Sequence, residues 1–262
     1  GLGSFPSLCP PVVNTFPYCE DFEGATLCQP STCTSVLACT GTALEAVGWD
    51  NSEADGTGNW SVDEGGTTST ATGPGNGSGS GQPDYVPGTS TGNYVYMESG
   101  SCAGNTIDVL SPVFDVTGMV NGSIRARMAY NMYGATMGTM SVQIEDPALS
   151  NNWTTLWTLS GDQGQGWFLT PNMDHVFTGP AVRYRVRGVS GTSFTSDMAF
   201  DYFCVRPTPL CTDPVATVTG ATPDCSTNSL TVGVEVTSIG SATSVAVEAS
   251  INNGPYTTVC SL

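Results

Sequence analysis

The sequence predicts an all-β protein, and three observations lead to this prediction. Charged residues make up 11% of the 262 residues, less than half of the roughly 25% usual for a soluble protein, so the residues that build amphipathic helices are scarce. Apolar and polar residues alternate in several segments, which is the period of a β-strand. The 32 glycines and 17 prolines supply turns between short strands. A hydrophobic content of 39% is enough for a core and argues against disorder.

The clearest predicted strand is segment 123–133. It places Ile124 and Met128 on one face and Arg125 and Arg127 on the other. Segments that alternate in this way are typical of half-buried antiparallel strands. The same pattern predicts further strands at 94–98, 139–145, 153–159, 181–189 and 199–205.

A domain boundary is expected near 206–214, where three prolines interrupt the chain. We therefore predict two domains, residues 1–207 and 208–262. The second domain reads as four short strands at 215–220, 229–238, 244–251 and 256–260. Four strands are about half of an immunoglobulin-like sandwich and would leave an open sheet edge. We therefore expect this domain to be truncated and the chain to be part of a longer protein or assembly.

The Gly/Ser/Thr-rich segment 64–92 is expected to be a long surface loop. Its composition offers few apolar side chains for a core.

The ten cysteines indicate the compartment in which the protein works. None of them has the CxxC spacing of a zinc or redox motif, and there is one histidine in the chain. An even number of scattered cysteines is typical of disulfides in an oxidising environment. The chain begins at Gly1 without a methionine or an apolar signal segment, which we interpret as the mature form of a secreted or cell-surface protein. No apolar run approaches the roughly 20 residues that span a bilayer, so direct membrane insertion is not expected.

The net charge of −17 argues against nucleic acid as a partner, because phosphate backbones would repel the chain. Nine of the 23 acidic residues lie in segment 20–64, which has no basic residue. Flexible carboxylates of this kind suit Ca²⁺, which is abundant outside cells. The alternative interpretation is a solvated acidic loop without a bound ion.

The chain does not contain a convincing catalytic motif. A Ser-His-Asp or Cys-His mechanism would have to use His175, and the neighbouring Asp174 cannot face it from the next position of a strand. The G-x-S-x-G, H-E-x-x-H, P-loop and dinucleotide-binding motifs are absent. We therefore predict that the protein is not an enzyme.

The arginines permit two interpretations. Arg183, Arg185 and Arg187 alternate along one segment and would line one exposed sheet face, which Arg125 and Arg127 could extend. They could pair with the protein's own carboxylates across strands. Alternatively, they could form a basic patch for an anionic glycan or another partner.

Short motifs along the first domain together resemble a MAM domain. The resemblance covers roughly residues 16–206, and it is the ordered set that is specific, because each motif alone is weak. The motifs are CEDFE at 19–23, LC at 27–28, GW at 48–49, NW at 59–60, GNYVYM at 92–97, LSP at 110–112, YNMYG at 130–134, GTM at 138–140, QGW at 165–167, RG at 187–188 and DMAFDY at 197–202. The sequences of these motifs are most similar to those of MAM-like modules in secreted Bacteroidetes proteins, which are often exported by the type IX route.

The resemblance implies a jelly-roll β-sandwich, so the full prediction is a jelly roll followed by a partial immunoglobulin-like or fibronectin-like sandwich. It also implies a non-catalytic role in adhesion, with a protein or a cell-surface glycan as partner. Two alternatives remain, namely an accessory module of a larger secreted hydrolase and a carbohydrate-binding module whose tryptophans stack on sugars.

The resemblance further implies a structural calcium ion near the joined ends of the domain. The implied ligands are Asp21 and Glu23 from the first strand, Asp50, and Asp201 from the last strand, with Asp197 as a weaker addition.

The implied disulfides are Cys19–Cys28, and Cys225–Cys260 in the second domain. Segment 29–40 inserts two further cysteines into the family pattern, and the other pairings stay open.

Overall fold

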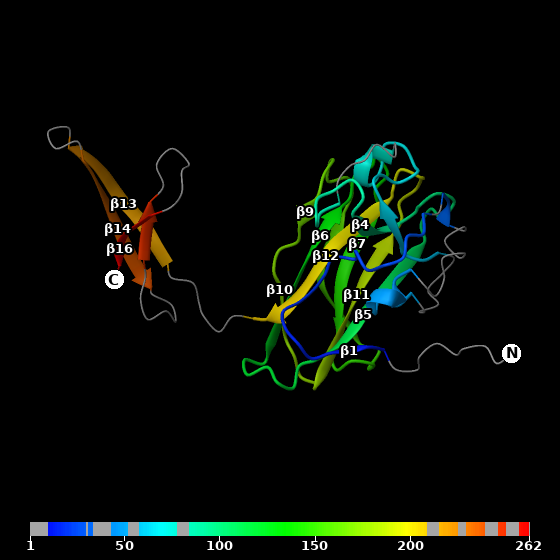
Figure 1. The fold of residues 1–262 in the computed structure, drawn as a ribbon, viewed down its shortest axis with the longest axis horizontal. Helices are drawn as coiled ribbons and strands as arrows, with labels where there is room; N and C mark the ends of the chain where they lie inside the picture. Colours follow the sequence, from blue (N-terminus) through cyan, green and yellow to red (C-terminus); the bar gives the residue numbers. More distant parts are fainter. Residues whose placement is uncertain are drawn as a thin grey trace. The chain divides into compact units, whose positions relative to one another are not determined.

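The computed structural model of the chain divides into two compact units, residues 1–208 and 209–262 (Figure 1). The first unit is described at residues 10–29, 31–33, 43–51, 58–77 and 84–208, and the second at 215–224, 229–238, 246–249 and 257–261. Each unit is considered by itself below. Both are built from β-strands, and the described residues contain no α-helix.

One layer of the first unit is a five-stranded sheet. In spatial order its strands are β1 (Val12–Val13), β5 (Thr106–Asp115), β11 (Ala181–Val189), β7 (Thr139–Glu145) and β8 (Trp153–Ser160). The pairs β5–β11, β11–β7 and β7–β8 are antiparallel, whereas β1 runs parallel to β5.

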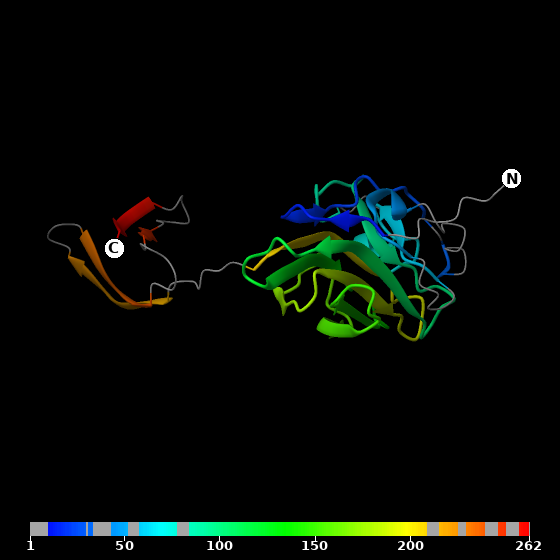
Figure 2. The ribbon, with the colours of Figure 1, turned by 90° about the horizontal axis from the view of Figure 1, so that it is seen from below.

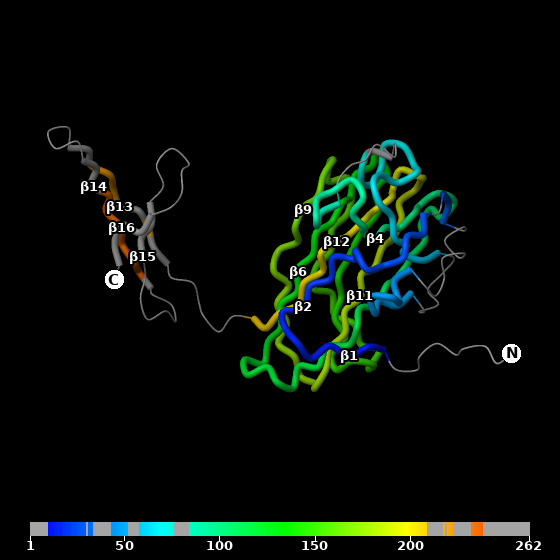
Figure 3. The backbone as a smooth tube through the Cα atoms, in the orientation of Figure 1, coloured from blue at the N-terminus to red at the C-terminus, as the bar shows by residue number. Residues whose placement is uncertain are grey.

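The other layer is a seven-stranded sheet (Figures 1 and 2). Its main path is β10 (Met173–Val176), β6 (Ser123–Asn131), β12 (Met198–Pro207), β4 (Asn93–Met97) and β3 (Ser61–Glu64). Two short strands complete it: β2 (Tyr18–Glu20) pairs with β12, and β9 (Phe168–Leu169) pairs with β6. Figure 3 shows β2 running beside β12.

The predicted all-β sandwich is confirmed, and the alternation in the sequence explains it. In β6, Ile124, Ala126 and Met128 have no exposed surface, whereas Arg127 between them is exposed. The strands predicted at 94–98, 139–145, 153–159, 181–189 and 199–205 all form within one or two residues of the expected bounds.

Aromatic side chains fill the space between the layers. Trp49 packs against Phe200 and Phe203, with ring centroids 5.6 and 5.1 Å apart. Tyr184 of the five-stranded sheet packs against Phe203 of the seven-stranded sheet at 5.5 Å. Trp60 is 1% exposed and packs on Phe200. Trp49 and Trp60 therefore belong to the core and do not form a stacking platform for sugars.

Segment 64–92 is only partly the expected surface loop: residues 87–91 are exposed, but other described residues of the segment are buried. Thr67 and Thr72 have no exposed surface, and Asp84 is 3% exposed. The segment contains a short 3₁₀ helix, η3 (Pro74–Gly77); another, η2 (Glu45–Val47), precedes Trp49. Its threonines are buried because they donate hydrogen bonds to backbone carbonyls, as Thr72 does to Tyr133.

None of the described helices is long and apolar enough to cross a membrane.

The predicted Cys19–Cys28 disulfide is wrong. Cys19 is bonded to Cys204, 185 residues away in the sequence. The two lie directly opposite each other in the β2–β12 pair, so strand register, and not closeness in sequence, selects the partner. Cys28 is also disulfide-bonded. A further disulfide joins Cys33 to Cys102.

The second unit contains two antiparallel pairs, β13 (Val215–Asp224) with β14 (Ser229–Ser238), and β15 (Ala246–Ala249) with β16 (Thr257–Ser261). These positions agree with the four strands expected there. The partial immunoglobulin-like sandwich stays a prediction. The predicted Cys225–Cys260 disulfide lies outside the described residues and side chains.

Candidate functional site

Asp201 lies in β12 where the pairing with β6 is interrupted. Its side chain has no exposed surface, and its Oδ2 accepts hydrogen bonds from the N–H groups of Tyr85 and Val86, both at 3.0 Å. The N–H of Tyr202 donates to Oδ1 at 2.6 Å. Burial nevertheless raises the pKa of Asp201 to about 8, and the charge of Asp84 contributes to the shift. Asp201 therefore ties the strand to the segment around residue 85.

Asp21 and Glu23 lie in the same acidic region. Glu23 Oε1 accepts a hydrogen bond from the N–H of Asn93 at 2.6 Å. Desolvation raises the pKa of Glu23, and the charges of Asp84 and Asp21 raise it further. The charge of Asp21 in turn contributes to the raised pKa of Asp84. Three of the four expected calcium ligands thus lie within electrostatic reach of Asp84, a residue that the sequence reasoning did not single out.

Asp84 is the buried member of this acidic region. Its Oδ1 accepts hydrogen bonds from the N–H groups of Gly88 and Thr89 at 2.9 and 2.8 Å. Its Oδ2 is buried and has no hydrogen-bond partner among the described residues. A Cβ at Gly92 would come within 2.3 Å of that oxygen, so only glycine fits there. An orphaned carboxylate oxygen is a suitable donor for Ca²⁺.

The side chains do not form a closed metal shell. Across the described part of the chain, no group of three or more His, Cys, Asp or Glu side chains is arranged to hold a metal ion. Asp21, Glu23 and Asp201 share one region of the seven-stranded sheet and its neighbouring loops, but their carboxylates point to different partners.

Asp50 lies in different surroundings. Its backbone pairs with Leu110 of β5, in the five-stranded sheet. Its Oδ2 is 3.5 Å from Arg183 Nη2, so a cation already lies beside this carboxylate. The structure therefore places Asp50 beside an arginine of the five-stranded sheet, whereas the other three expected ligands lie at the seven-stranded sheet.

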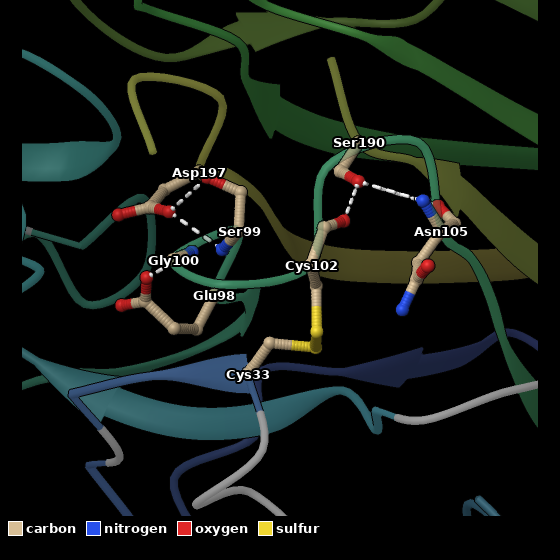
Figure 4. Close-up of a disulfide and its surroundings, with 8 residues drawn as sticks. All are labelled: Cys33, Glu98, Ser99, Gly100, Cys102, Asn105, Ser190 and Asp197. Atoms are coloured by element: carbon tan, nitrogen blue, oxygen red, sulfur yellow. Dashed lines mark hydrogen bonds between the residues drawn. A yellow bond between two sulfur atoms is a disulfide. The ribbon is translucent and has the colours of Figure 1, made fainter. Parts of the chain in front are cut away.

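A second pair of acids is fully buried near the Cys33–Cys102 disulfide (Figure 4). Glu98 is 1% exposed and Asp197 has no exposed surface. Asp197 Oδ1 accepts hydrogen bonds from the N–H and the hydroxyl of Ser99, both at 2.9 Å. Burial, together with the charge of Glu98, raises the pKa of Asp197 to about 7. Sequence reasoning named Asp197 but not its partner, because the two are 99 residues apart and no spacing rule connects them.

The expectation that Arg183, Arg185 and Arg187 line an exposed face is wrong. Arg183 and Arg185 are only 6% and 9% exposed. Arg187 binds Asp108 through two hydrogen bonds of 2.7 and 2.6 Å, and Arg185 Nη1 lies 3.3 Å from the same carboxylate. The alternative of pairing with the protein's own carboxylates is confirmed. The three arginines belong to β11 in the five-stranded sheet, whereas Arg125 and Arg127 lie on β6 in the other sheet.

A groove of about 360 Å³ lies on the seven-stranded sheet. Its walls combine cationic and aromatic side chains with the disulfide that joins β2 to β12. Arg125 binds both oxygens of Asp174 at 2.5 and 2.8 Å, and Arg127 donates from Nε to the carbonyl of Thr170 at 3.0 Å. The lining residues are Pro17, Cys19, Tyr85, Arg125, Ala126, Arg127, Leu169, Tyr202, Cys204 and Arg206.

His175 lies on β10. Its Nε2 is 3.1 Å from Asp146 Oδ2. The N–H of Thr178 and the ring of His175 hold the pKa of Asp146 below its usual value, against the effect of burial. The histidine thus connects β10 to the loop after β7. This is a structural role.

Comparison with known proteins gives a consistent family. The model of the MAM domain, meprin/A5/mu, matches residues 21–205. The MAM domain-containing glycosylphosphatidylinositol anchor protein 2 of Mus musculus and that of Homo sapiens are each 28% identical to the chain over 123 residues. This alignment covers 44% of the chain and 12% of each relative, so the chain spans about an eighth of their length.

Solved structures with a similar fold include adhesin and carbohydrate-binding domains. The K2 cleaved adhesin domain of Lys-gingipain is 14% identical with a TM-score of 0.44, and the alignment covers 72% of this chain and 98% of that domain. A family 22 carbohydrate-binding module of Clostridium thermocellum Xyn10B is 12% identical with a TM-score of 0.40, covering 75% and 95%. The family match extends from the first acidic motif to the end of the last strand of the sandwich, well over half of the chain, and the chain therefore belongs to the MAM domain family.

Proposed function

We propose that the chain is a non-catalytic extracellular module for adhesion or protein interaction, part of a secreted or cell-surface bacterial protein. The observation that carries this proposal is a disulfide-linked sandwich with an open groove. Cys19–Cys204 joins the first strand of the seven-stranded sheet to the last, and the groove lies directly beside this disulfide. Disulfides of this kind fit an extracellular location. Sandwiches held in this way present binding surfaces at little cost in ordering.

The surroundings of the histidine support a non-catalytic role. His175 is bound to Asp146, which also accepts hydrogen bonds from the N–H groups of Thr178 and Gly179 at 2.6 and 2.8 Å. The carboxylate is therefore part of a turn network. A triad would need a nucleophile within hydrogen-bond reach of the histidine.

Adhesion is tested by coating beads with the full chain and measuring their attachment to cultured epithelial cells and to an extracellular-matrix layer. Beads coated with heat-unfolded chain are the control. We expect attachment that the free folded chain inhibits. Equal attachment of folded and unfolded chain would contradict the proposal.

We also propose that calcium stabilises the module in the acidic region of Asp21, Glu23 and Asp201. The orphaned Oδ2 of Asp84 and the raised pKa values of Glu23 and Asp201 support this, because a divalent cation would offset the crowding of carboxylates. A ligand at 100 times its Kd stabilises the folded state by about 2.7 kcal/mol.

Scanning calorimetry in calcium and in EDTA tests this proposal. We expect a lower melting temperature in EDTA, and we expect Asp201→Asn to remove the difference. Asp50→Asn is the matched variant: Asp50 lies beside Arg183, so we expect it to keep the calcium dependence. The calcium proposal fails if the wild-type melting temperature is the same with and without chelator.

The groove favours a second candidate function, a carbohydrate-binding module of a larger secreted hydrolase. The two candidates are separated by the domains that accompany this chain in its natural protein. A glycoside hydrolase domain would favour the second.

A further inference from the structure

We propose that the groove on the seven-stranded sheet binds an acidic saccharide, a sugar that carries a carboxylate or sulfate group. In this assignment Arg127 and Arg206 bind the anionic group, and Tyr85 and Tyr202 pack against the sugar ring. The inference rests on the proposed function as a binding module and names the class of ligand.

The distribution of positive charge is the first argument. The chain has six basic residues and a net charge of −17, yet three of its arginines line this one groove. Asp174 uses both carboxylate oxygens for Arg125. Within the described residues, Arg127 and Arg206 have no ion pair, although Arg206 lies close enough to help lower the pKa of Asp174. Both side chains are exposed, so their guanidinium groups are accessible to a ligand.

The strand register is the second argument. In the β12–β6 pair, Arg206 lies directly opposite Arg125, and Arg127 lies opposite Cys204. Like charges that face each other across strands destabilise a sheet. The carboxylate of Asp174 offsets the charge of Arg125, which lies opposite it in the β10–β6 pair. An anion bound between Arg127 and Arg206 would offset the positive charge of these two arginines. The fork of N–H donors on an arginine suits carboxylate and sulfate oxygens.

The third argument is the position of the tyrosines. Tyr85 and Tyr202 have ring centroids 6.0 Å apart, tilted by 42°, and both line the groove. Tyr202 has a positive φ of 51° at the interruption of the β12–β6 pairing, and bulges of this kind redirect side chains. The carboxylate of Asp201 accepts hydrogen bonds from the backbone N–H groups of both tyrosines, and these bonds hold Tyr85 beside Tyr202. Aromatic rings of this kind offer apolar faces to the C–H faces of sugars.

A saccharide fits this site better than an acidic peptide. Peptides commonly bind sheets by pairing with a free strand edge. Here β6 is paired with β12 on one side and with β9 and β10 on the other, and β12 is paired with β6, β2 and β4. The strands that carry the arginines therefore have partners on both sides. Recognition must come from the side chains that line the groove.

The test uses isothermal titration of the full chain with oligogalacturonate, with its methyl ester as a neutral match of the same backbone, with a heparin-derived oligosaccharide and with a poly-glutamate peptide. We expect binding of at least one anionic saccharide, weaker binding at high salt, and no binding of the methyl ester. Arg127→Gln and Arg206→Gln should each weaken binding about tenfold. Arg187→Gln, which removes the same charge from the other sheet, should leave the affinity unchanged.

Three results would overturn the inference. They are binding of neither anionic saccharide, equal binding of the methyl ester, and tighter binding of the peptide than of either saccharide. A cooperative melting transition above the assay temperature shows that each variant is folded. Bead attachment to cells separates this inference from the proposed function: attachment that Arg206→Gln does not weaken would leave the adhesion module standing while the groove is rejected as its saccharide site.

Discussion

The two sheets of the sandwich use arginine in opposite ways. In the five-stranded sheet, Arg185 and Arg187 converge on Asp108, which is 2% exposed. In the seven-stranded sheet, Arg127 and Arg206 are exposed and line a groove, and the carboxylate of Asp174 is bound by the third arginine of that groove, Arg125.

This difference shows that alternation of arginine with apolar residues does not by itself indicate an exposed basic face. Arg183 and Arg185 are buried because their strand lies in the middle of its sheet, between β5 and β7, and because the carboxylates of Asp50 and Asp108, on and beside β5, pair with them. Where no such carboxylate is available, the same residue type stays exposed. The first arrangement stabilises the fold, and the second is suited to binding.

The largest effect is expected from removing the buried carboxylate. Asp108→Ala removes the carboxylate that lies 3.3 Å from the buried guanidinium of Arg185, so we expect the free energy of unfolding to fall by about 3–5 kcal/mol. Asp174→Ala, which removes the carboxylate bound to Arg125, is the matched variant and should cost less than about 1 kcal/mol, because the Asp174 side chain is 44% exposed. Urea denaturation measures both. Equal losses would remove the distinction between the two sheets.

An intermediate effect is expected where a buried carboxyl faces another carboxyl in place of an arginine. The folded-state pKa of Asp197 is raised to about 7, above its ordinary value of 3.8. The folded state therefore holds a proton that the unfolded state releases, so stability is greatest below about pH 4 for this group and falls as the pH rises towards 7. The slope is at most about 1.4 kcal/mol per pH unit.

Asp197→Asn should flatten this pH dependence, which thermal melts between pH 4.5 and 7.5 in EDTA would measure. Asp108→Asn serves as the contrast, because its wild-type carboxylate is held by arginines and not by another acid. A wild-type melting temperature that rises over this pH range would contradict the assignment.

The smallest effect is expected in the groove itself. Arg206→Gln removes an exposed charge that forms no ion pair with the described residues. The unfolding free energy of this variant should therefore stay within about 0.5 kcal/mol of the wild-type value. A loss above 2 kcal/mol would mean that Arg206 has a structural role, and the comparison between the sheets would then fail.

Sequence reasoning found most of the long strands and missed β5, together with the short strands β1, β2, β3, β9 and β10. β6 and β11 alternate clearly, and their bounds agree with the prediction. β5 was not predicted, because Ile107 to Phe114 are all buried and therefore show no period of two, and Pro112 within it is unusual for a strand.

The site was only partly predictable, for a similar reason. Asp21, Glu23 and Asp201 were identified through motifs, but Asp84 lies in a Gly/Ser/Thr-rich segment that resembles an exposed loop in composition. Its burial follows from hydrogen bonds to Gly88 and Thr89, which no periodicity reveals. The groove, likewise, depends on Tyr85, Arg127 and Arg206 meeting from distant parts of the chain.

The sequence by itself determined the fold class, the use of disulfides and the family, because composition, period and ordered motifs are local properties of a chain. Only the tertiary structure decided which cysteine bonds to Cys19, which arginines pair with a carboxylate and which acids are buried beside another acid. Each of these depends on strand register and burial, and these properties are set when segments far apart in the chain pack together.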